Sequence, residues 1–526
     1  MRGLLVIAAL GALGLCTIGC QARDKARPAA TPFASESADE VLADEWYRVA
    51  INGQPCGYAR YRSSLRDAVI TTTYEERVIE SHGGQPLEMV YLGTWEETAR
   101  HQPMRYIVQQ RDGAAGVVDT YRFTPDHIER VSRQGDRQTT ATLAHPRGDW
   151  LTPGQVDVVL KEAMAEGQRR IALKVYDPQI VDRPYTVIYD EPAHGQRVEI
   201  ADGSRVEATR WRVAYSYLPG MPAYEYYDSA GVAVKYEIDM GGGAVVTRTL
   251  ADASVAEAEF DPPEMADRSM VRPDRPIEAI GRVKLAVYEL TFGDPADGPL
   301  GVQPPNTQYQ RVARLGDRRV RLTIDMRRAP DLAGADPPGD AYLAASIAVD
   351  HTDPVVQGLT RRVAGQLKAD HGPADFARAA ELFVASHIRG GSLSVGSATA
   401  SEAARTREGD CTESAVLLAA MLRARGIPSR CVYGLVYTED PFLDQPGVFV
   451  YHMWTQAWVS APIPADDPNA TATDGYWMEV DAAMLGYTAG HLALGLTAMG
   501  ENADAEALRL VPMTADLAVK VIRIER

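Results

Sequence analysis

Apolar and polar residues alternate in short runs through the first half of the chain, from about Trp46 to Ala258. A period of two residues is typical of β-strands that bury one face. The run RVEIADGSRVEATRWRVAY alternates on both sides of Asp202-Gly203, a dipeptide that favours a tight hairpin turn because it tolerates positive φ. The pattern predicts a mostly antiparallel, strongly curved sheet over residues 41–259, with one helix in the segment VDVVLKEAMAEGQRRI. Such a sheet can carry a ligand groove, but a scaffold or a partner-docking surface is the favoured interpretation.

The pattern changes after a stretch with several prolines and no periodicity, residues 260–276, which we interpret as a linker. Two strand-like runs, RVKLAVYELTF and RVRLTIDM, predict a small β module over 277–340. Helical spacing of apolar residues over 354–367 and 374–388 then opens a last region, 341–526. The expected fold class is α+β, with the β-rich region first and a mixed domain of helices and strands last.

Composition places the chain among soluble globular proteins with several domains. It has 526 residues, of which 45% are hydrophobic and 24% are charged. The net charge of -17 disfavours nucleic acid as a partner, because binding to a duplex needs clustered Lys and Arg that displace counterions. A protein or peptide substrate is easier to accommodate.

The N-terminus has the pattern of an export signal. Arg2 supplies a positive charge, Leu4–Leu15 forms an apolar stretch too short to span a membrane, and Gly19 precedes Cys20. Residues 1–19 are therefore predicted to be a signal peptide.

The segment TIGC, which ends at Cys20, resembles the processing site of bacterial lipoproteins. The resemblance implies that Cys20 carries lipid as the first residue of the mature protein; an ordinary signal peptide is the alternative. Gln21 stands where Asp would imply inner-membrane retention in such lipoproteins. Residues 20–40, rich in Ala, Pro, Ser and charge, are predicted to form a flexible tether. We expect an exported protein that is anchored to the membrane by lipid, at the periplasmic face of the outer membrane.

The cysteine count argues against a complete disulfide framework. Without the predicted signal the chain has Cys20, Cys56, Cys411 and Cys431. If Cys20 carries lipid, an odd number remains, so at least one thiol stays free.

Cys411 lies at the predicted start of a helix. Asp410 suits the N-cap and Glu413 follows three residues later, which is the spacing of a capping box. Apolar residues follow at helical spacing, and Gly426 with Pro428 ends the helix. The helix dipole at this position favours a thiolate, which is the reactive form of cysteine. A cysteine at a helix start is still more often a core residue than a nucleophile, so partners are needed.

Two further segments supply the partners. The strand-like run VFVYHMWTQAWVS carries His452, and Trp454 lies on the same face by the two-residue period. The next strand, in GYWMEVDAA, ends at Asp481. Neighbouring strands can bring a His and an Asp together beside a helix start, which a thiol enzyme needs as a base and as the group that orients the base.

The three blocks GDCTESAVLLAAMLRARGIPSRCVYGLVY, HMWTQAWV and YWMEVDAA resemble the core of the transglutaminase-like superfamily over roughly residues 374–494. The resemblance implies a papain-like α+β domain, with Cys411 as the nucleophile, His452 as the base and Asp481 as the orienting acid. Trp454 is a candidate for lining the substrate site, although an aromatic face of a strand more often serves packing. His491 occupies a position where relatives often have a histidine, and we interpret it as structural rather than catalytic.

The implied activity is cysteine-dependent acyl transfer on peptide or amide bonds, and we favour hydrolysis over crosslinking by transamidation. A catalytically inactive binding module at the membrane remains the alternative from a different class. We expect no cofactor and no metal. The chain has no HExxH, no zinc-type pair of CxxC motifs and no GxSxG, so metallopeptidase and serine-hydrolase hypotheses have no support.

Overall fold

The computed structural model divides the chain into two compact units, one ending at Glu264 and one beginning at Met265. It describes residues 39–526 except for 83–84, 113–114, 136, 181–182, 219–220, 222, 241–243, 266–269, 294–302, 329–336, 391–397, 442–444, 461–474, 501–502, 504–512 and 514–515. The predicted signal peptide, Cys20 and nearly all of the predicted tether lie outside these residues. Within them, no helix has the length and apolar character needed to cross a membrane.

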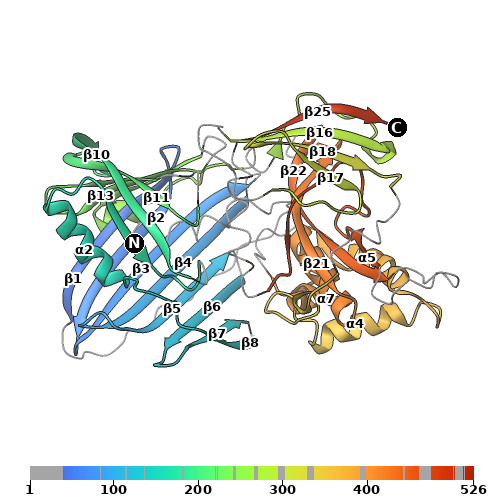
Figure 1. Cartoon of the computed structure of the whole chain (residues 1–526), viewed down its shortest axis with the longest axis horizontal. Helices are drawn as coiled ribbons and strands as arrows, with labels where there is room; N and C mark the ends of the chain where they lie inside the picture. The colour runs from blue at the N-terminus through green and yellow to red at the C-terminus, as the bar shows by residue number, and fades with distance from the viewer. Residues whose placement is uncertain are drawn as a thin grey trace. The chain divides into compact units, whose positions relative to one another are not determined.

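The first unit is built on one antiparallel sheet of 14 strands (Figure 1). Its order is β8-β7-β6-β5-β4-β3-β2-β1-β14-β13-β12-β11-β10-β9, so the first strand pairs with both the second and the last of the unit. The strands are β1 (Glu40–Ile51), β2 (Gln54–Arg66), β3 (Val69–His82), β4 (Gln85–Thr98), β5 (Pro103–Asp112), β6 (Ala115–Phe123), β7 (Ile128–Gln134), β8 (Arg137–Leu143), β9 (Ile171–Val175), β10 (Tyr185–Glu199), β11 (Arg205–Tyr215), β12 (Ala223–Tyr227), β13 (Ala233–Asp239) and β14 (Val245–Ala251).

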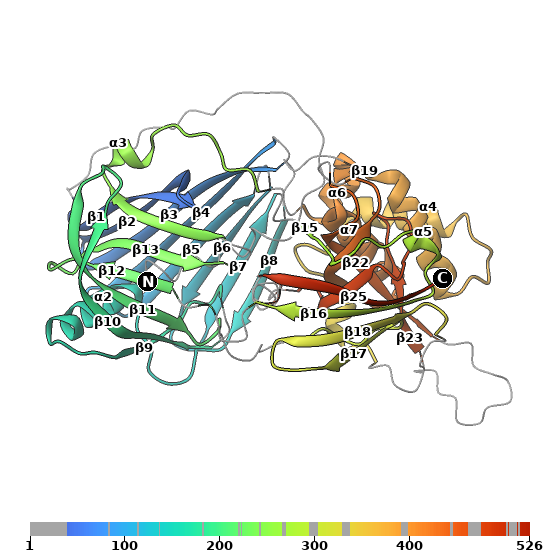
Figure 2. The same ribbon diagram turned by 90° about the horizontal axis from the view of Figure 1, so that it is seen from above.

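The sheet curves strongly (Figure 2). This curvature brings together strands that are far apart in the strand order. The Tyr106 hydroxyl of β5 donates a hydrogen bond to Asp177, which lies just after β9, at 3.4 Å. Helix α2 (Pro153–Ala165) begins with a capping box between Thr152 and Gln155 and buries its apolar side. A short helix, α3 (Ala253–Ala256), follows β14. The prediction of a large antiparallel N-terminal sheet is confirmed.

Alternation along the strands places an unusual number of tyrosines on the buried side of this sheet. Fully buried examples are Tyr61, Tyr74, Tyr91, Tyr121, Tyr189 and Tyr215. An ion pair lies among them, in which the Arg248 guanidinium donates to both Glu76 oxygens, with distances of 2.6 to 2.9 Å. Polar groups enter this core because they are paired there.

The described part of the second unit contains two main sheets and a group of α-helices. One sheet has the order β15-β22-β21-β24, with β23 paired to β22, and the other has the order β17-β18-β16-β25. A short parallel pair joins β19 and β20. The strands are β15 (Met270–Val271), β16 (Leu285–Phe292), β17 (Gln310–Arg314), β18 (Arg319–Asp325), β19 (Arg389–Gly390), β20 (Glu408–Gly409), β21 (Ser429–Thr438), β22 (Val448–Ser460), β23 (Gly475–Val480), β24 (His491–Thr497) and β25 (Leu517–Glu525).

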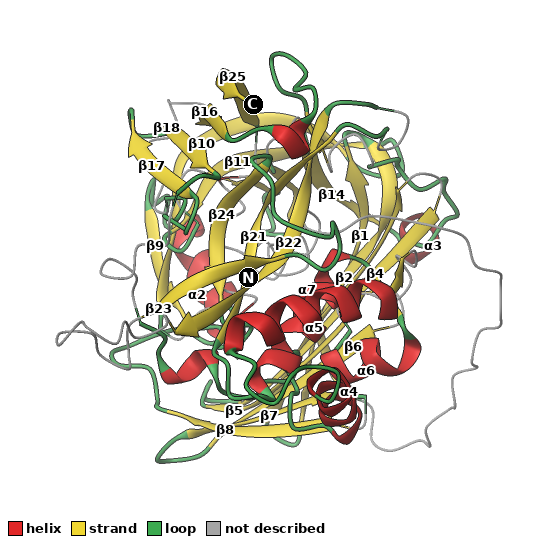
Figure 3. Cartoon of the chain, turned by 90° about the vertical axis from the view of Figure 1, so that its right-hand side faces the viewer, coloured by secondary structure: helices red, strands yellow, loops and turns green. Residues whose placement is uncertain are grey.

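The helices of the second unit gather together against the five-stranded sheet (Figure 3). They are α4 (Pro354–Ala364), α5 (Pro373–His387), α6 (Ala400–Thr406) and α7 (Cys411–Arg423). Nearly every residue of α7 is buried, which explains its almost uniformly apolar sequence. The α+β fold class predicted for this part of the chain is confirmed. Two strands reach across the predicted boundaries: β15 lies inside the predicted linker, and the C-terminal β25 pairs with β16 of the predicted small module.

Candidate active site

The start of α7 places Cys411 at the first helical position, with 4% of its surface exposed. Asp410 is the N-cap, and its side chain accepts from the Thr412 amide at 2.7 Å. The Glu413 carboxylate closes the capping box by accepting from the Asp410 amide at 2.9 Å. Gly409, at φ 152°, precedes this turn, and a Cβ atom there would lie 2.4 Å from Glu413. The chain can therefore enter the helix in this way only with glycine at that position.

Helix α7 is fixed to β22, the strand that carries His452. The Thr455 hydroxyl of β22 donates to the Ala415 carbonyl of α7 at 2.9 Å, and both groups are buried. Within the sheet, β22 pairs with β21 along one edge and with β23 along the other. In the pairing with β23, Thr455 is opposite Val480. Asp481 follows Val480 directly, so the same register brings the carboxylate beside the imidazole.

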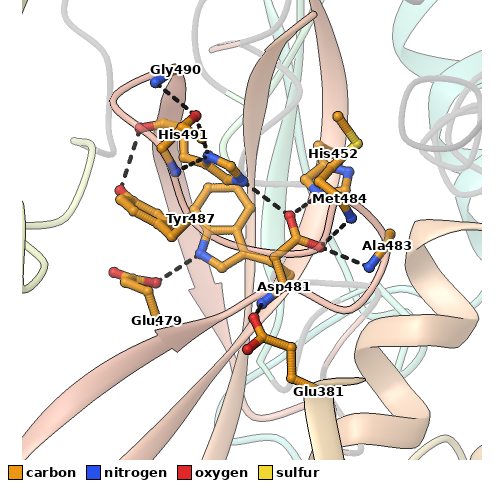
Figure 4. A network of polar contacts seen from close by, with 11 residues as sticks. Glu381, His452, Glu479, Asp481, Ala483, Met484, Tyr487, Gly490 and His491 are labelled. Carbon is orange, nitrogen blue, oxygen red and sulfur yellow. Dashed lines mark hydrogen bonds and ion pairs between the residues drawn. The ribbon is translucent and has the colours of Figure 1, made fainter. Parts of the chain in front are cut away.

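His452 and Asp481 form a buried pair (Figure 4). The His452 Nε2 atom lies 2.7 Å from Asp481 Oδ2, and each side chain is 1% exposed. The other carboxylate oxygen, Oδ1, accepts from the Ala483 amide at 2.9 Å and the Met484 amide at 3.1 Å. Glu381 of α5 accepts from the Asp481 amide at 2.7 Å. The carboxylate is thus held at both oxygens and at its own backbone.

Electrostatics favour the charged forms of this pair. Burial alone would lower the pKa of His452, but the Asp481 carboxylate, with a smaller contribution from the side chain of Cys411, raises it to about 10. Burial alone would raise the pKa of Asp481, but His452 and His491 hold it well below its usual range. The structure therefore brings the three predicted residues Cys411, His452 and Asp481 together in one buried cluster.

Trp454 lies behind the pair rather than on an open surface. Its ring is stacked on His452 with centroids 6.0 Å apart, and 1% of the residue is exposed. The indole Nε1 donates to Glu479 at 2.8 Å, and Gln456 donates to the other Glu479 oxygen at 2.7 Å. In this arrangement Trp454 supports the imidazole, and contact with substrate stays a prediction.

His491 also contacts the Asp481 carboxylate. Its Nε2 atom lies 3.0 Å from Asp481 Oδ2, the same oxygen that His452 contacts. The ligand-type atoms of His452, Asp481 and His491 all lie within 4.8 Å of one another, as in a metal site. However, the Nε2 atoms of both imidazoles lie at hydrogen-bond distance from the same oxygen, Asp481 Oδ2. This is the geometry of two hydrogen bonds that share one acceptor.

Two carboxylates of the site were missed by sequence reasoning. Glu381 lies among the buried residues Ala377, Ala380 and Val384 of α5. Glu479 lies in β23, two residues before Asp481, and is buried. In both cases the sequence signal for a buried polar site was an acidic residue on an otherwise apolar face. An acidic residue is rarely buried without a partner.

Comparisons with known proteins identify a family for one part of the chain. Residues 359–482 match the model of the transglutaminase-like superfamily. No curated protein matches the chain. Solved structures with some similarity include a β-barrel-like protein of a domain of unknown function from Brucella abortus, at 10% identity and a TM-score of 0.31, covering 41% of this chain and 98% of that one.

Two other solved structures are described as candidate proteases. One, a candidate cysteine protease from Cytophaga hutchinsonii, is 16% identical, with a TM-score of 0.26, 46% of this chain covered and 86% of that one. The other, from Parabacteroides distasonis, is 11% identical, with a TM-score of 0.16, 70% of this chain covered and 69% of that one. The family-model match over residues 359–482 shows that the second unit contains a transglutaminase-like domain, as the three sequence blocks predict.

Proposed function

We propose that the second unit catalyses cysteine-dependent acyl transfer on peptide or amide bonds, with water as the usual acceptor. The observation that carries this proposal is the position of His452. Its Nε2 is on Asp481, while its ring also interacts with Cys411 at the start of α7. A thiol, a base and an acid that orients the base are what nucleophilic acyl transfer requires.

In the first step the Cys411 thiolate attacks the carbonyl carbon of a carboxamide, and the protonated His452 stands ready as the acid. The start of α7 supplies the Cys411 backbone N–H and the positive end of the helix dipole to the developing oxyanion. The C–N bond then breaks, and His452 gives its proton to the departing amine. The product is a thioester on Cys411 and a neutral imidazole.

In the second step water attacks the thioester while His452 takes a proton from it. The C–S bond breaks, the acid product leaves, and the thiolate–imidazolium pair is restored. Asp481 accepts from Nε2 throughout and keeps the imidazole in the orientation that both proton transfers need. A primary amine in place of water would give transamidation instead.

Alkylation of Cys411 tests the proposal. The purified full chain in detergent is treated briefly with iodoacetamide across pH, and modified peptides are quantified by mass spectrometry for the wild type, Cys411→Ala and His452→Ala. Cys431 is an internal control, because burial raises the pKa of its thiol to about 12. Selective alkylation of Cys411 near pH 6 that weakens in His452→Ala is expected. Alkylation no faster than that of a free thiol, and insensitive to His452→Ala, would favour an inactive binding module.

We further propose that the protein is exported and anchored through lipid on Cys20 at the periplasmic face of the outer membrane, with a protein or peptide as substrate. The support is the N-terminal sequence and the acidic composition. Mass spectrometry of the N-terminal peptide should find lipid on Cys20, and Cys20→Ser should move the protein from the membrane to the soluble fraction. Equal membrane association of Cys20→Ser and wild type would contradict the anchor.

A further inference from the structure

The Asp481 carboxylate receives two imidazoles on one oxygen. Oδ2 lies 2.7 Å from His452 Nε2 and 3.0 Å from His491 Nε2. We propose that His491 is a positioning residue of the site: it donates a hydrogen bond that keeps Asp481 ionised and directed at His452. This inference rests on the proposed function, because it assigns His491 a part in the same proton transfers.

The neighbours of His491 identify which of its nitrogens carries the proton. The Thr488 amide N–H points at Nδ1 from 3.0 Å, so Nδ1 must accept. The proton is then on Nε2, which donates to Asp481 Oδ2 (Figure 4). Burial lowers the pKa of His491, which agrees with a neutral ring. A second proton on Nδ1 would face the Thr488 N–H and break that hydrogen bond.

The ring of His491 has little freedom to move. It is fully buried at the start of β24. Tyr487 is stacked on it with centroids 4.5 Å apart, and the Trp454 ring meets it edge-on at 5.3 Å. Because Trp454 is also stacked on His452, one indole packs against both imidazoles. The titratable groups around His491 are thus His452, Asp481 and Tyr487, with Glu479 on the far side of Trp454.

The two oxygens of the Asp481 carboxylate have different hydrogen-bond donors, and this gives His491 a specific role. Backbone amides hold Oδ1, so they restrain one oxygen only. At Oδ2, His491 is the one side-chain donor besides His452 among the described residues. When His452 gives a proton to the leaving amine, its Nε2 proton must stay in place. A second donor at Oδ2 prevents the carboxylate from rotating away or from taking that proton.

Two substitutions, His491→Gln and His491→Leu, distinguish a hydrogen-bonding role of His491 toward Asp481 from a role in packing alone. Gln at position 491 can place an amide N–H near the position of Nε2, whereas Leu cannot donate at all. Both variants remove the acceptor for Thr488, so their losses of stability should be similar. The readout is the rate of Cys411 alkylation by iodoacetamide between pH 4 and 9 in the full chain, alongside urea unfolding of each variant.

We expect the acid limb of the alkylation profile to move up by about one pH unit in His491→Leu, with roughly a tenfold loss of rate at pH 6. His491→Gln should stay within about threefold of the wild type. Identical profiles for His491→Leu and wild type, or equal shifts for Leu and Gln, would overturn the positioning role. The proposed function fails separately, if wild-type Cys411 is not activated or does not depend on His452.

A measurement on the unmodified protein guards against variants that do not fold. In ¹⁵N NMR of histidine-labelled wild type, His491 should be the neutral tautomer protonated on Nε2, with its proton shifted downfield by the carboxylate. A proton on Nδ1, or a charged ring at pH 7, would refute the assignment.

Discussion

The Nε2 atom of His452 and the Oδ2 atom of Asp481 lie 2.7 Å apart in a setting where each side chain is 1% exposed. A buried charge is costly unless it is paired, so each group stabilises the ionised form of the other. The high pKa of His452 is therefore a property of the pair and depends on Asp481.

Asp481→Asn removes the charge while keeping the shape of the side chain. Burial, which lowers the pKa of His452, then becomes the leading effect, and the imidazolium is no longer favoured. Alkylation of Cys411 at pH 6 should slow about tenfold or more. The exposed Asp440→Asn is a matched control that should leave the rate unchanged. An Asp481→Asn variant that reacts like the wild type would show that the pair does not activate the thiol.

Glu479 predicts a pH dependence of stability. Burial raises its pKa to about 6, although donors such as Trp454 and Gln456 oppose this rise. The folded state thus binds the proton more tightly than the unfolded state, whose Glu has a pKa near 4.5. Stability from this group is fully present below pH 4.5 and is lost as pH rises through about 6, by a total of about 2 kcal/mol.

Glu479→Gln cannot titrate, so this decline should be missing from it. Urea unfolding of the second unit at pH 4.5 and pH 7 measures the decline in the wild type and in the variant. The variant should also be less stable at every pH, since the Gln amide must direct an N–H at Trp454 or at Gln456, both of which are donors. The exposed Glu408→Gln serves as the control. The same pH dependence in Glu479→Gln and wild type would assign it to another group.

Local signals in the sequence, together with the resemblance of three blocks to a known family, were enough to find the cluster of Cys411, His452 and Asp481. Asp410 and Glu413 mark the start of α7, and the two-residue period around His452 marks β22. These features act over a few residues, so a sequence pattern can carry them. The helix in the first unit was also predicted, but its start moved to Pro153, because the capping box of Thr152 and Gln155 fixes it there.

Contacts between distant segments could not be predicted. Glu381 binds the amide of Asp481 across 100 residues of sequence, and β1 pairs with β14, the last strand of the first unit along the chain. The pairing of β25 with β16 similarly closes a sheet from the far end of the chain. Such partners are chosen by tertiary packing, and a strand-like run alone does not indicate which edge it will join.

Gly434 gives a prediction that connects packing to the site. It is opposite His452 in the β21–β22 register, and a Cβ atom there would lie 2.2 Å from the Leu492 carbonyl oxygen and 2.7 Å from the Trp454 ring. Gly434→Ala should lower the free energy of unfolding by about 1 to 3 kcal/mol and slow alkylation of Cys411, because Trp454 must move away from His452.

Gly358→Ala is the control for the Gly434→Ala variant. That glycine lies in α4 with open space around it, so Ala should stabilise the helix by about 0.5 to 1 kcal/mol. Normal alkylation in a folded Gly434→Ala variant would show that the packing of Trp454 does not influence the site.

The buried pair of Arg248 and Glu76 gives the corresponding prediction for the first unit. The guanidinium donates three hydrogen bonds to the carboxylate, and the side chains are 3% and 1% exposed. Arg248→Met leaves the Glu76 carboxylate in the core without its cation and should destabilise the unit by about 3 to 5 kcal/mol in urea unfolding. Adding Glu76→Leu removes the unpaired group, so the double variant should recover much of that loss. A double variant as unstable as Arg248→Met alone would mean that Arg248 stabilises the sheet through its packing on Tyr236, whose ring lies 5.1 Å from the guanidinium carbon, rather than through its charge.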